Sequence, residues 1–550
     1  MIRIFLIALF PNERFPFVGE SHGICAISGY LNEKYSGLIE IDLFDQQINS
    51  DEEILNEIKL KRPEIIGFSV KMQTLNKLDV LYNLILKNTS SSYKPLIILG
   101  NSTAHFNSDY LLSKYDDILV SFGEGEVSFD DIIKYVNGTI HIDKVRNIGY
   151  RKGREIIYNV REYLSPDEIP IADRRYSESY YIQGGEVYIE GSRGCAYCCC
   201  SICECRFFLG SQNSLNKWRP KTVSKIVSEL SELERLGIKE VTFSDEDFIG
   251  DDISGICHAS QIADELMKQK LNVQYRINAR IHSIFCQSDN PANRNRKIQL
   301  LRKLKASGLV KIFLGFESGS DSQLKRYNKG FKLSEFISAK KILDDLAIEY
   351  ELGYISLDPL MTLEELKESL LFIKRNNCIP YISNIYKELR IQSGNQAYLR
   401  KVRNYEHCNN IQILGTLDMN EQIYSIDKYA DSRVELLRRC LNEYEAQTYQ
   451  LYYRMRILTQ YSETNDNIYN QITHRTLHEI KSLDFNLMME LISDIELHNG
   501  SNIIIIIDKY NVYRYEVYMI FAKQVANFGN ESSAINYIGT SFKKAISVLS

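Results

Sequence analysis

The first 140 residues alternate short apolar runs with amphipathic stretches. The apolar runs predict strands at 2–9, 39–44, 64–70, 94–100 and 117–121, and the amphipathic stretches predict helices at 20–33, 51–61, 74–88, 107–115 and 126–136. Strands that are apolar almost throughout are typical of a parallel sheet covered on both faces. We therefore predict a doubly wound, Rossmann-like α/β domain over 1–140, whose ligands would lie at the carboxyl ends of its strands.

The pattern breaks over 141–185, which reads as a small hairpin and a proline-bearing linker. It resumes at 186 with six further strand–helix units, whose strands are expected at 187–192, 239–244, 272–279, 310–316, 349–357 and 379–384. Six repeated units predict a partial (β/α)6 TIM-like barrel over 186–390, with chemistry on the loops after the strands. The last part, 391–550, has mostly helical patterns at 420–459 and 475–497, and the run "NIIIIID" at 502–508 is expected to be a buried strand.

Composition narrows the class of protein. The 550 residues carry a net charge of −5, which gives no electrostatic footprint for nucleic acid. No apolar run reaches the length of a membrane span, and we expect a cytoplasmic protein. In a reducing compartment a dense cysteine cluster indicates metal binding or catalysis rather than disulfides.

Such a cluster occurs at 191–206, "GSRGCAYCCCSICECR", directly after the first barrel strand. A zinc site usually takes two well-separated ligand pairs, and here the pairs lie too close together. An iron–sulfur cluster, which binds thiolates at short spacing, fits better.

The segment "SRGCAYCCCSICECR" resembles the cluster-binding loop of the radical SAM superfamily, and more closely that of its members with an N-terminal cobalamin-binding domain. The family spacing is Cys-x3-Cys-x2-Cys, whereas one inserted residue gives Cys195, Cys200 and Cys203 here. We take these three as the ligands of a [4Fe-4S] cluster, with Cys199 as the alternative middle ligand. Cys205 stays unassigned.

Other strand ends carry the same resemblance in the same order. It implies that "FSDEDF" (243–248) and "INARIH" (277–282) contact S-adenosylmethionine (SAM), and that "FLGFESGSD" (313–321) lies near its ribose or methionine end. The residues implied to bind SAM are Asp245, Glu246, Arg280, Glu317 and Ser318.

The first domain resembles the cobalamin-binding domain of these enzymes, through "GFSV" (67–70), "ILGN" (98–101) and "FGEGE" (122–126). The signature Asp-x-His-x-x-Gly is absent, so the resemblance implies base-off cobalamin without a protein histidine ligand. The implied cobalamin contacts are Ser69, Gly100, Asn101, Gly123, Glu124 and Gly125.

The resemblance implies a cobalamin-dependent methyltransferase that acts on an unactivated carbon or phosphorus through a 5′-deoxyadenosyl radical and methylcobalamin. One alternative is a radical cyclisation, ring contraction or rearrangement without methyl transfer, and another is a cofactor-holding sensor or scaffold. Expected partners are a small-molecule or peptide-like substrate and a one-electron donor such as flavodoxin or ferredoxin. The segment 391–550 is expected to cap the barrel or to bind substrate.

Overall fold

The first unit of the chain is built on a seven-stranded sheet in the order β2-β1-β3-β4-β5-β6-β7. The computed structural model describes residues 1–11, 19–88, 93–204, 218–250, 253–442, 444, 452 and 468–526. Strands β1 to β5 are parallel, as the continuous apolar runs predict. The strands are β1 (Ile2–Ala8), β2 (Ile39–Asp45), β3 (Ile65–Ser69), β4 (Leu96–Gly100), β5 (Ile118–Ser121), β6 (Ile148–Lys152) and β7 (Glu155–Tyr158).

Helices cover both faces of this sheet, with a separate apolar core on each side. Helix α2 begins with a capping box between Ser50 and Glu53, and its apolar side is buried. The helices are α1 (His22–Lys34), α2 (Asp51–Lys61), α3 (Leu75–Lys87), α4 (Ser102–Phe106), α5 (Ser108–Lys114) and α6 (Gly125–Val136). The hairpin β6–β7 is antiparallel and extends the first sheet, so it belongs to this unit structurally.

The second unit contains a five-stranded parallel sheet in the order β14-β13-β12-β11-β8. Its strands are β8 (Tyr188–Ile189), β11 (Glu240–Phe243), β12 (Gln274–Ala279), β13 (Leu309–Glu317) and β14 (Glu349–Tyr354), and a short antiparallel pair joins β9 (Ser192–Gly194) to β10 (Trp218–Pro220). Its helices are α9 (Val223–Arg235), α10 (Ser254–Gln269), α11 (Ile281–Ile284), α12 (Pro291–Ala306), α13 (Asp321–Tyr327), α14 (Leu333–Asp345) and α15 (Leu363–Arg375), and α7 (Ser177–Ile182) precedes them.

The predicted α/β architecture is confirmed, but the sixth barrel strand is not a strand along its length. Residues Ile379–Tyr381 form a 3-10 helix, and Ile382 makes only an isolated parallel bridge to Leu352. Pro380 has no N–H to donate to a sheet, which favours the helical turn over a sixth strand.

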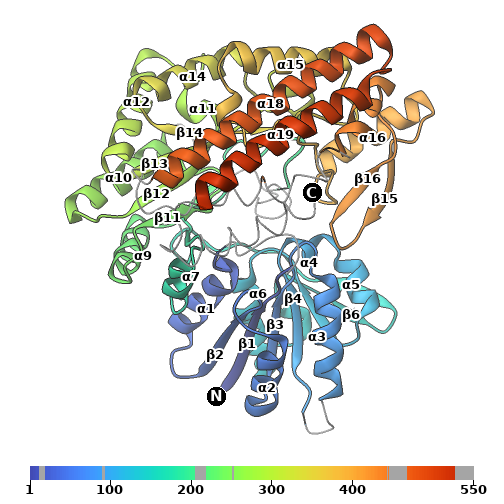
Figure 1. Ribbon diagram of the computed structural model, residues 1–550. Coiled ribbons are helices and arrows are strands. Elements are labelled where there is room, and N and C mark those ends of the chain that lie inside the picture. The colour runs from blue at the N-terminus through green and yellow to red at the C-terminus, as the bar shows by residue number, and fades with distance from the viewer. Residues whose placement is uncertain are drawn as a thin grey trace.

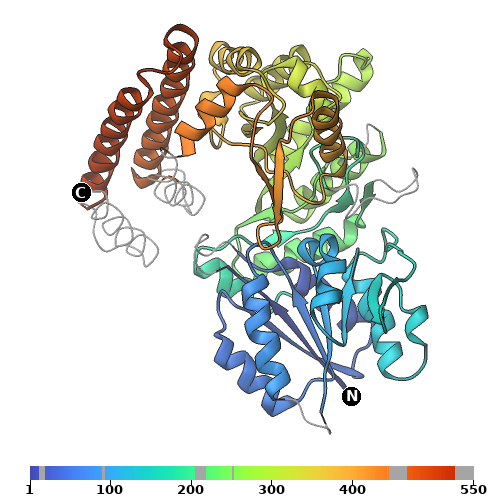
Figure 2. The same cartoon turned by 90° about the vertical axis from the view of Figure 1, so that its right-hand side faces the viewer.

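The C-terminal part packs against the outside of the second unit. Helices α18 (Ile468–His498) and α19 (Ile503–Ala526) form an antiparallel pair across it (Figures 1 and 2), and their apolar residues join the same hydrophobic core. The run 502–508, expected to be a strand, instead begins α19, so that prediction is wrong. No helix of the described residues is long and apolar enough to cross a membrane.

A hairpin from the C-terminal part reaches back to the first unit. It follows α16 (Gln396–Asn409) and consists of β15 (Leu414–Asp418) and β16 (Ile423–Ile426). At its tip, Asn420 Oδ1 accepts a hydrogen bond from Leu75 N over 3.0 Å at the start of α3, and both carboxylate oxygens of Glu421 accept from Gln73 Nε2 over 2.8 Å. The sequence pattern predicts helix over part of this hairpin, from residue 420, and that prediction is wrong.

Candidate functional site

The carboxyl ends of the parallel strands in the two units face one another. The N-terminus lies at the far end of the first unit, so β1 runs toward the second unit (Figure 1). Between the two units the described residues line a cavity of about 630 Å³. Asn101 and Ser102, which follow β4, line it from the first unit, and the cysteine loop lines it from the second.

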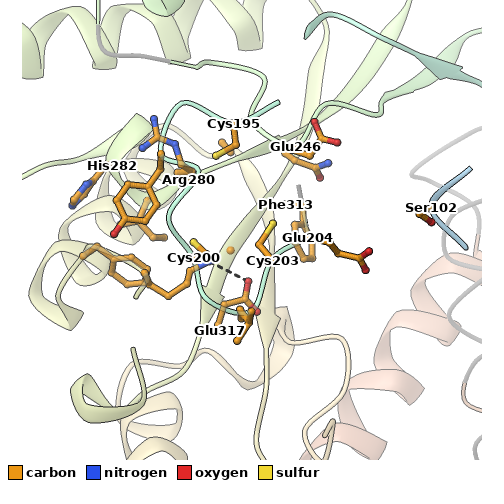
Figure 3. Close-up of a pocket in the computed structure, with 18 of the residues that line it drawn as sticks. Ser102, Cys195, Cys200, Cys203, Glu204, Glu246, Arg280, His282, Phe313 and Glu317 are labelled. Carbon is orange, nitrogen blue, oxygen red and sulfur yellow. Dashed lines mark hydrogen bonds and ion pairs between the residues drawn. The ribbon is translucent and has the colours of Figure 1, made fainter. Parts of the chain in front are cut away.

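Three of the loop's sulfur-bearing residues line this cavity, and they are Cys195, Cys200 and Cys203. Figure 3 shows their side chains around one common space. Among the described cavity-lining residues neither Cys198 nor Cys199 occurs, and Cys199 is exposed. Cys205 lies outside the described residues. The arrangement is that of the expected ligand triad, whose assignment remains a prediction.

The chemistry of these thiols fits a metal cluster. Burial raises the pKa of Cys195 to about 12, with Asp247 as a further cause, and burial also raises the pKa of Cys200. Thiolates in such surroundings are unfavourable without a bound cation, and coordination to iron removes the thiol proton. A three-cysteine site of this kind would leave one iron of a [4Fe-4S] cluster without a protein ligand.

Two of the residues expected to bind SAM come from the ends of β12 and β13 and line the cavity. Arg280 follows β12, and its guanidinium donates to Asp247 Oδ2 over 2.5 Å and to the carbonyl of Gly250 over 2.7 Å. Glu317 ends β13 with a φ of 66° and pairs with Lys329 at 3.4 Å, the contact drawn as a dashed line in Figure 3. Strand order therefore brings these two side chains to one site.

The two adjacent acidic residues after β11, Asp245 and Glu246, point in different directions. Glu246 lines the cavity and accepts a hydrogen bond from Gly194 N over 3.2 Å. Loss of solvation raises the pKa of its carboxyl to about 8. Asp245 is buried beside the cavity wall, where it accepts from Gly191 N over 2.9 Å and from Ser192 Oγ over 2.5 Å. Asp245 thus supports the start of the cysteine loop, and the structure does not bring its carboxylate to the cavity.

Ser318 is likewise buried away from the cavity, where its hydroxyl donates to Gln323 Oε1 over 2.5 Å. Sequence reasoning missed Asp247, although it stands in the quoted segment "FSDEDF". This carboxylate is fully buried, holds Arg280, and lies 3.9 Å from the Cys195 sulfur. Sequence reasoning also gave no role to Lys329 and Glu204, which line the cavity.

The residues expected to contact cobalamin surround the ends of β3, β4 and β5. Asn101 lines the cavity, has a φ of 79° and donates from Nδ2 to Ser69 Oγ over 3.0 Å, which places both residues and Gly100 at one edge. Gly123 has a φ of 108°, a conformation that favours glycine, and Gly125 begins α6.

Glu124 has a different environment from the one expected for a ligand contact. Its carboxylate is buried and accepts from Arg219 over 2.5 Å and from Leu164 N over 2.6 Å, and it lies 3.4 Å from Arg193. Both arginines belong to the second unit, beside the cysteine loop. The Glu124 side chain therefore joins the two units.

These geometries can be compared with known proteins. Residues 189–373 match the family model described as the radical SAM superfamily. These residues therefore form a radical SAM domain. The predicted resemblance is confirmed, and with it the expectation of a [4Fe-4S] cluster and SAM, whereas the residues that would hold them stay a prediction.

Among characterised relatives, the chain is 29% identical over 390 residues to a 4′-phospho-dehydrooxetanocin synthase of Priestia megaterium, a match that covers 68% of this chain and 51% of that protein. It is 25% identical over 331 residues to a hopanoid C-3 methylase of Methylococcus capsulatus, covering 58% of each. The chain thus spans about half the length of these relatives.

Two solved structures share the fold around the radical SAM domain. The cobalamin-dependent SAM radical enzyme OxsB, with aqua-cobalamin and SAM bound, superimposes with a TM-score of 0.83 at 21% identity, over 99% of this chain and 84% of that one. The radical SAM methyltransferase TsrM of Kitasatospora setae gives a TM-score of 0.58 at 14% identity, over 74% and 77%.

Proposed function

We propose that this radical SAM enzyme binds cobalamin and uses it with the cluster and SAM in one cavity. The observation that carries the proposal is the shared cavity, which joins Asn101 and Ser102 at the end of β4 to Cys195, Cys200 and Cys203. The fold likeness to OxsB, whose structure holds both cobalamin and SAM, extends over nearly the whole chain and supports the same placement.

The protein's own groups would divide the work. The three thiolates would hold the cluster, Arg280 would receive the methionyl carboxylate of SAM, and Glu246 and Glu317 would accept from its ammonium and ribose groups. Asn101, Ser69 and Gly100 would form the edge against which cobalamin lies. Bound together, these cofactors supply a carbon-centred radical and a cobalt centre able to exchange an alkyl group.

Methyl transfer to an unactivated carbon or phosphorus is the first candidate reaction. The methylase and methyltransferase relatives support it, through the hopanoid C-3 methylase and a 23% identical uncharacterised methyltransferase of Pyrococcus horikoshii. A radical ring rearrangement without methyl transfer is the second candidate. It is favoured by the match to the dehydrooxetanocin synthase and by the full-length likeness to OxsB.

The substrate would be a small molecule or peptide-like, and a cytoplasmic one-electron donor of the flavodoxin or ferredoxin kind would reduce the cluster. The sensor or scaffold alternative has a cofactor site but no need for SAM cleavage. The Arg280, Glu246 and Glu317 side chains around the cysteines favour an enzyme over that alternative.

The test begins with anaerobic purification and loading with iron, sulfide and hydroxocobalamin, followed by absorption and EPR spectra. Reduction in the presence of SAM is expected to release 5′-deoxyadenosine, and no release would contradict the enzyme proposal. The matched control is the Cys195→Ala/Cys200→Ala/Cys203→Ala variant, which is expected to bind cobalamin but no cluster. S-adenosylhomocysteine formed with the product favours methyl transfer, and its absence favours rearrangement.

A further inference from the structure

The turn Asn328–Gly330, which follows α13, packs against the cysteine loop. Asn328 ends the helix in the left-handed conformation with a φ of 53°, and its Nδ2 donates to the carbonyl of Cys199 over 2.8 Å. Next to it, Ser201 donates from its backbone N–H to the carbonyl of Tyr327 over 2.8 Å and from Oγ to that of Arg326 over 2.9 Å. The loop between the second and third predicted ligands is therefore held by the residues that end α13.

The same turn approaches the first half of the loop at Gly330. This glycine has a φ of 78°, and a Cβ added to it would lie 2.6 Å from the Tyr197 hydroxyl. Tyr197 stands between Cys195 and Cys198 and lines the cavity. Because neither the backbone conformation nor the space admits a larger side chain, the turn packs directly against the loop.

Between these two anchors, Lys329 extends its side chain into the cavity. Only 14% of the side chain is exposed, Nζ lies 3.4 Å from Glu317 Oε1, and a Cβ added at Gly315 would lie 3.1 Å from Nζ. Cys200 and Cys203, two of the three predicted ligands, line the same cavity as Lys329. The ammonium, paired with a carboxylate, therefore brings a positive charge to the cavity wall that these two thiols share.

We propose that Lys329 is a positioning residue whose fixed positive charge stabilises the reduced form of the cluster held by Cys200 and Cys203, and that Glu317 opposes this effect. The inference rests on the proposed function, since it needs the cluster at these thiols. One-electron reduction of the cluster by an external low-potential donor adds one negative charge to it. A cation in a poorly solvated site favours that added charge, and a carboxylate disfavours it.

Two other roles for Lys329 are separable from this one. If the ammonium serves only to receive the carboxylate of SAM, its loss weakens SAM binding but leaves the potential of the SAM-free cluster unchanged. If it only pairs with Glu317 to hold the fold, its loss lowers stability and again leaves that potential unchanged. The decisive measurement is therefore the midpoint potential of the cluster without SAM.

The experiment compares Lys329→Met, Lys329→Arg and the wild type by anaerobic redox titration, with the EPR signal of the reduced cluster as the readout. In Lys329→Met we expect reduction to become about tenfold less favourable, a shift of about 59 mV to more negative potential for a one-electron couple. Lys329→Arg retains the positive charge, and its cluster is expected to have a midpoint potential close to that of the wild type. The matched control is Lys325→Met, at an exposed lysine of α13, and it is expected to leave the potential unchanged.

A second variant keeps the test decisive if Lys329→Met loses iron. Glu317→Gln retains the lysine and removes the opposing carboxylate, so its potential is expected to move to more positive values. Unchanged potentials in fully loaded Lys329→Met and Glu317→Gln would overturn the inference. A wild type that takes up no cluster would instead overturn the proposed function, so the two failures are distinguishable.

Discussion

Arg280 donates a hydrogen bond from Nε to Oδ2 of Asp247 over 2.5 Å, so a buried carboxylate after β11 orients an arginine after β12. Asp247 is fully buried, and Arg280 is its partner for one of the two oxygens. A second guanidinium nitrogen is held by the carbonyl of Gly250. The arginine is thus fixed before any ligand arrives, which favours tight binding of a carboxylate.

The first prediction concerns this pair. Asp247→Asn removes the charge that orients Arg280, and we expect the affinity for SAM to fall about tenfold, which corresponds to about 1.4 kcal/mol. Equilibrium binding of SAM to the cluster-loaded protein measures it. Asp264→Asn, at a half-exposed carboxylate paired with Lys303, is the control and is expected to bind SAM normally. Equal affinities of Asp247→Asn and wild type would contradict the orienting role.

The second prediction separates the two candidate ligand sets of the cysteine loop. Cys200 lines the cavity with Cys195 and Cys203, whereas Cys199 is not among the cavity-lining residues and its carbonyl accepts a hydrogen bond from Asn328. Cys200→Ser is expected to lose most of its iron and sulfide after anaerobic loading, and Cys199→Ser to keep wild-type content. Iron and sulfide assays with EPR spectra of the reduced protein give the answer. Loss in Cys199→Ser with retention in Cys200→Ser would establish the alternative triad.

The predictable part of the site followed from one rule about parallel sheets and from the family resemblance. Side chains just after neighbouring parallel strands meet at one edge, and the resemblance singled out Arg280, Glu317 and the cysteines among them. The rule predicts which loops lie together at that edge, but it does not predict which way each side chain of a loop points. Asp245 and Glu246 are adjacent, yet one supports the loop and the other faces the cavity.

Contacts between distant segments could not be read from the sequence. Lys329 lines the same cavity as Cys200 and Cys203 because the residues that end α13 pack against the cysteine loop, and Glu124 meets Arg219 across the two units. The run "NIIIIID" failed for another reason. Ile503, Ile506 and Ile507 are buried while Ile504 and Ile505 are exposed, which is helical spacing, but in a run of isoleucines every position is apolar and the period is hidden.

The third prediction concerns the joint between the two units. Glu124→Gln leaves Arg219 buried without its carboxylate, and we expect the free energy of unfolding at pH 7 to fall by about 3–5 kcal/mol. Its two arginine partners overcome the effect of burial and hold the pKa of Glu124 below its ordinary value. The contribution is therefore present at neutral pH and is lost as the pH falls below about 4.5, through the folded pKa.

Denaturant unfolding at pH 7 and at pH 4 measures this loss. Glu162→Gln is the control, because Glu162 is 52% exposed and its pair with Arg146 is expected to contribute less than about 1 kcal/mol. A Glu124→Gln variant with wild-type stability and weakened cobalamin binding would favour the ligand contact expected from the sequence instead.

The fourth prediction concerns Asp245, whose pKa burial raises to about 7 despite hydrogen bonds from Ser192 and Gly191. Between about pH 4 and pH 7 the carboxyl is ionised in the unfolded chain but holds its proton in the folded protein. The free energy of unfolding therefore falls as the pH rises through this range, and the contribution of this carboxyl becomes constant above pH 7. Asp245→Asn resembles the protonated form and lacks this dependence.

We therefore expect cofactor-free Asp245→Asn to gain stability relative to the wild type between pH 5 and pH 7, by on the order of a few kcal/mol. Denaturant unfolding at pH 5, 6, 7 and 8 gives the two profiles, and the exposed Asp264→Asn serves as the reference for a charge change without burial. Parallel profiles for Asp245→Asn and wild type would mean that Asp245 is ionised in the folded protein. In that case the start of the cysteine loop would rest on a carboxylate, and the thiols beside it would be harder to ionise without iron.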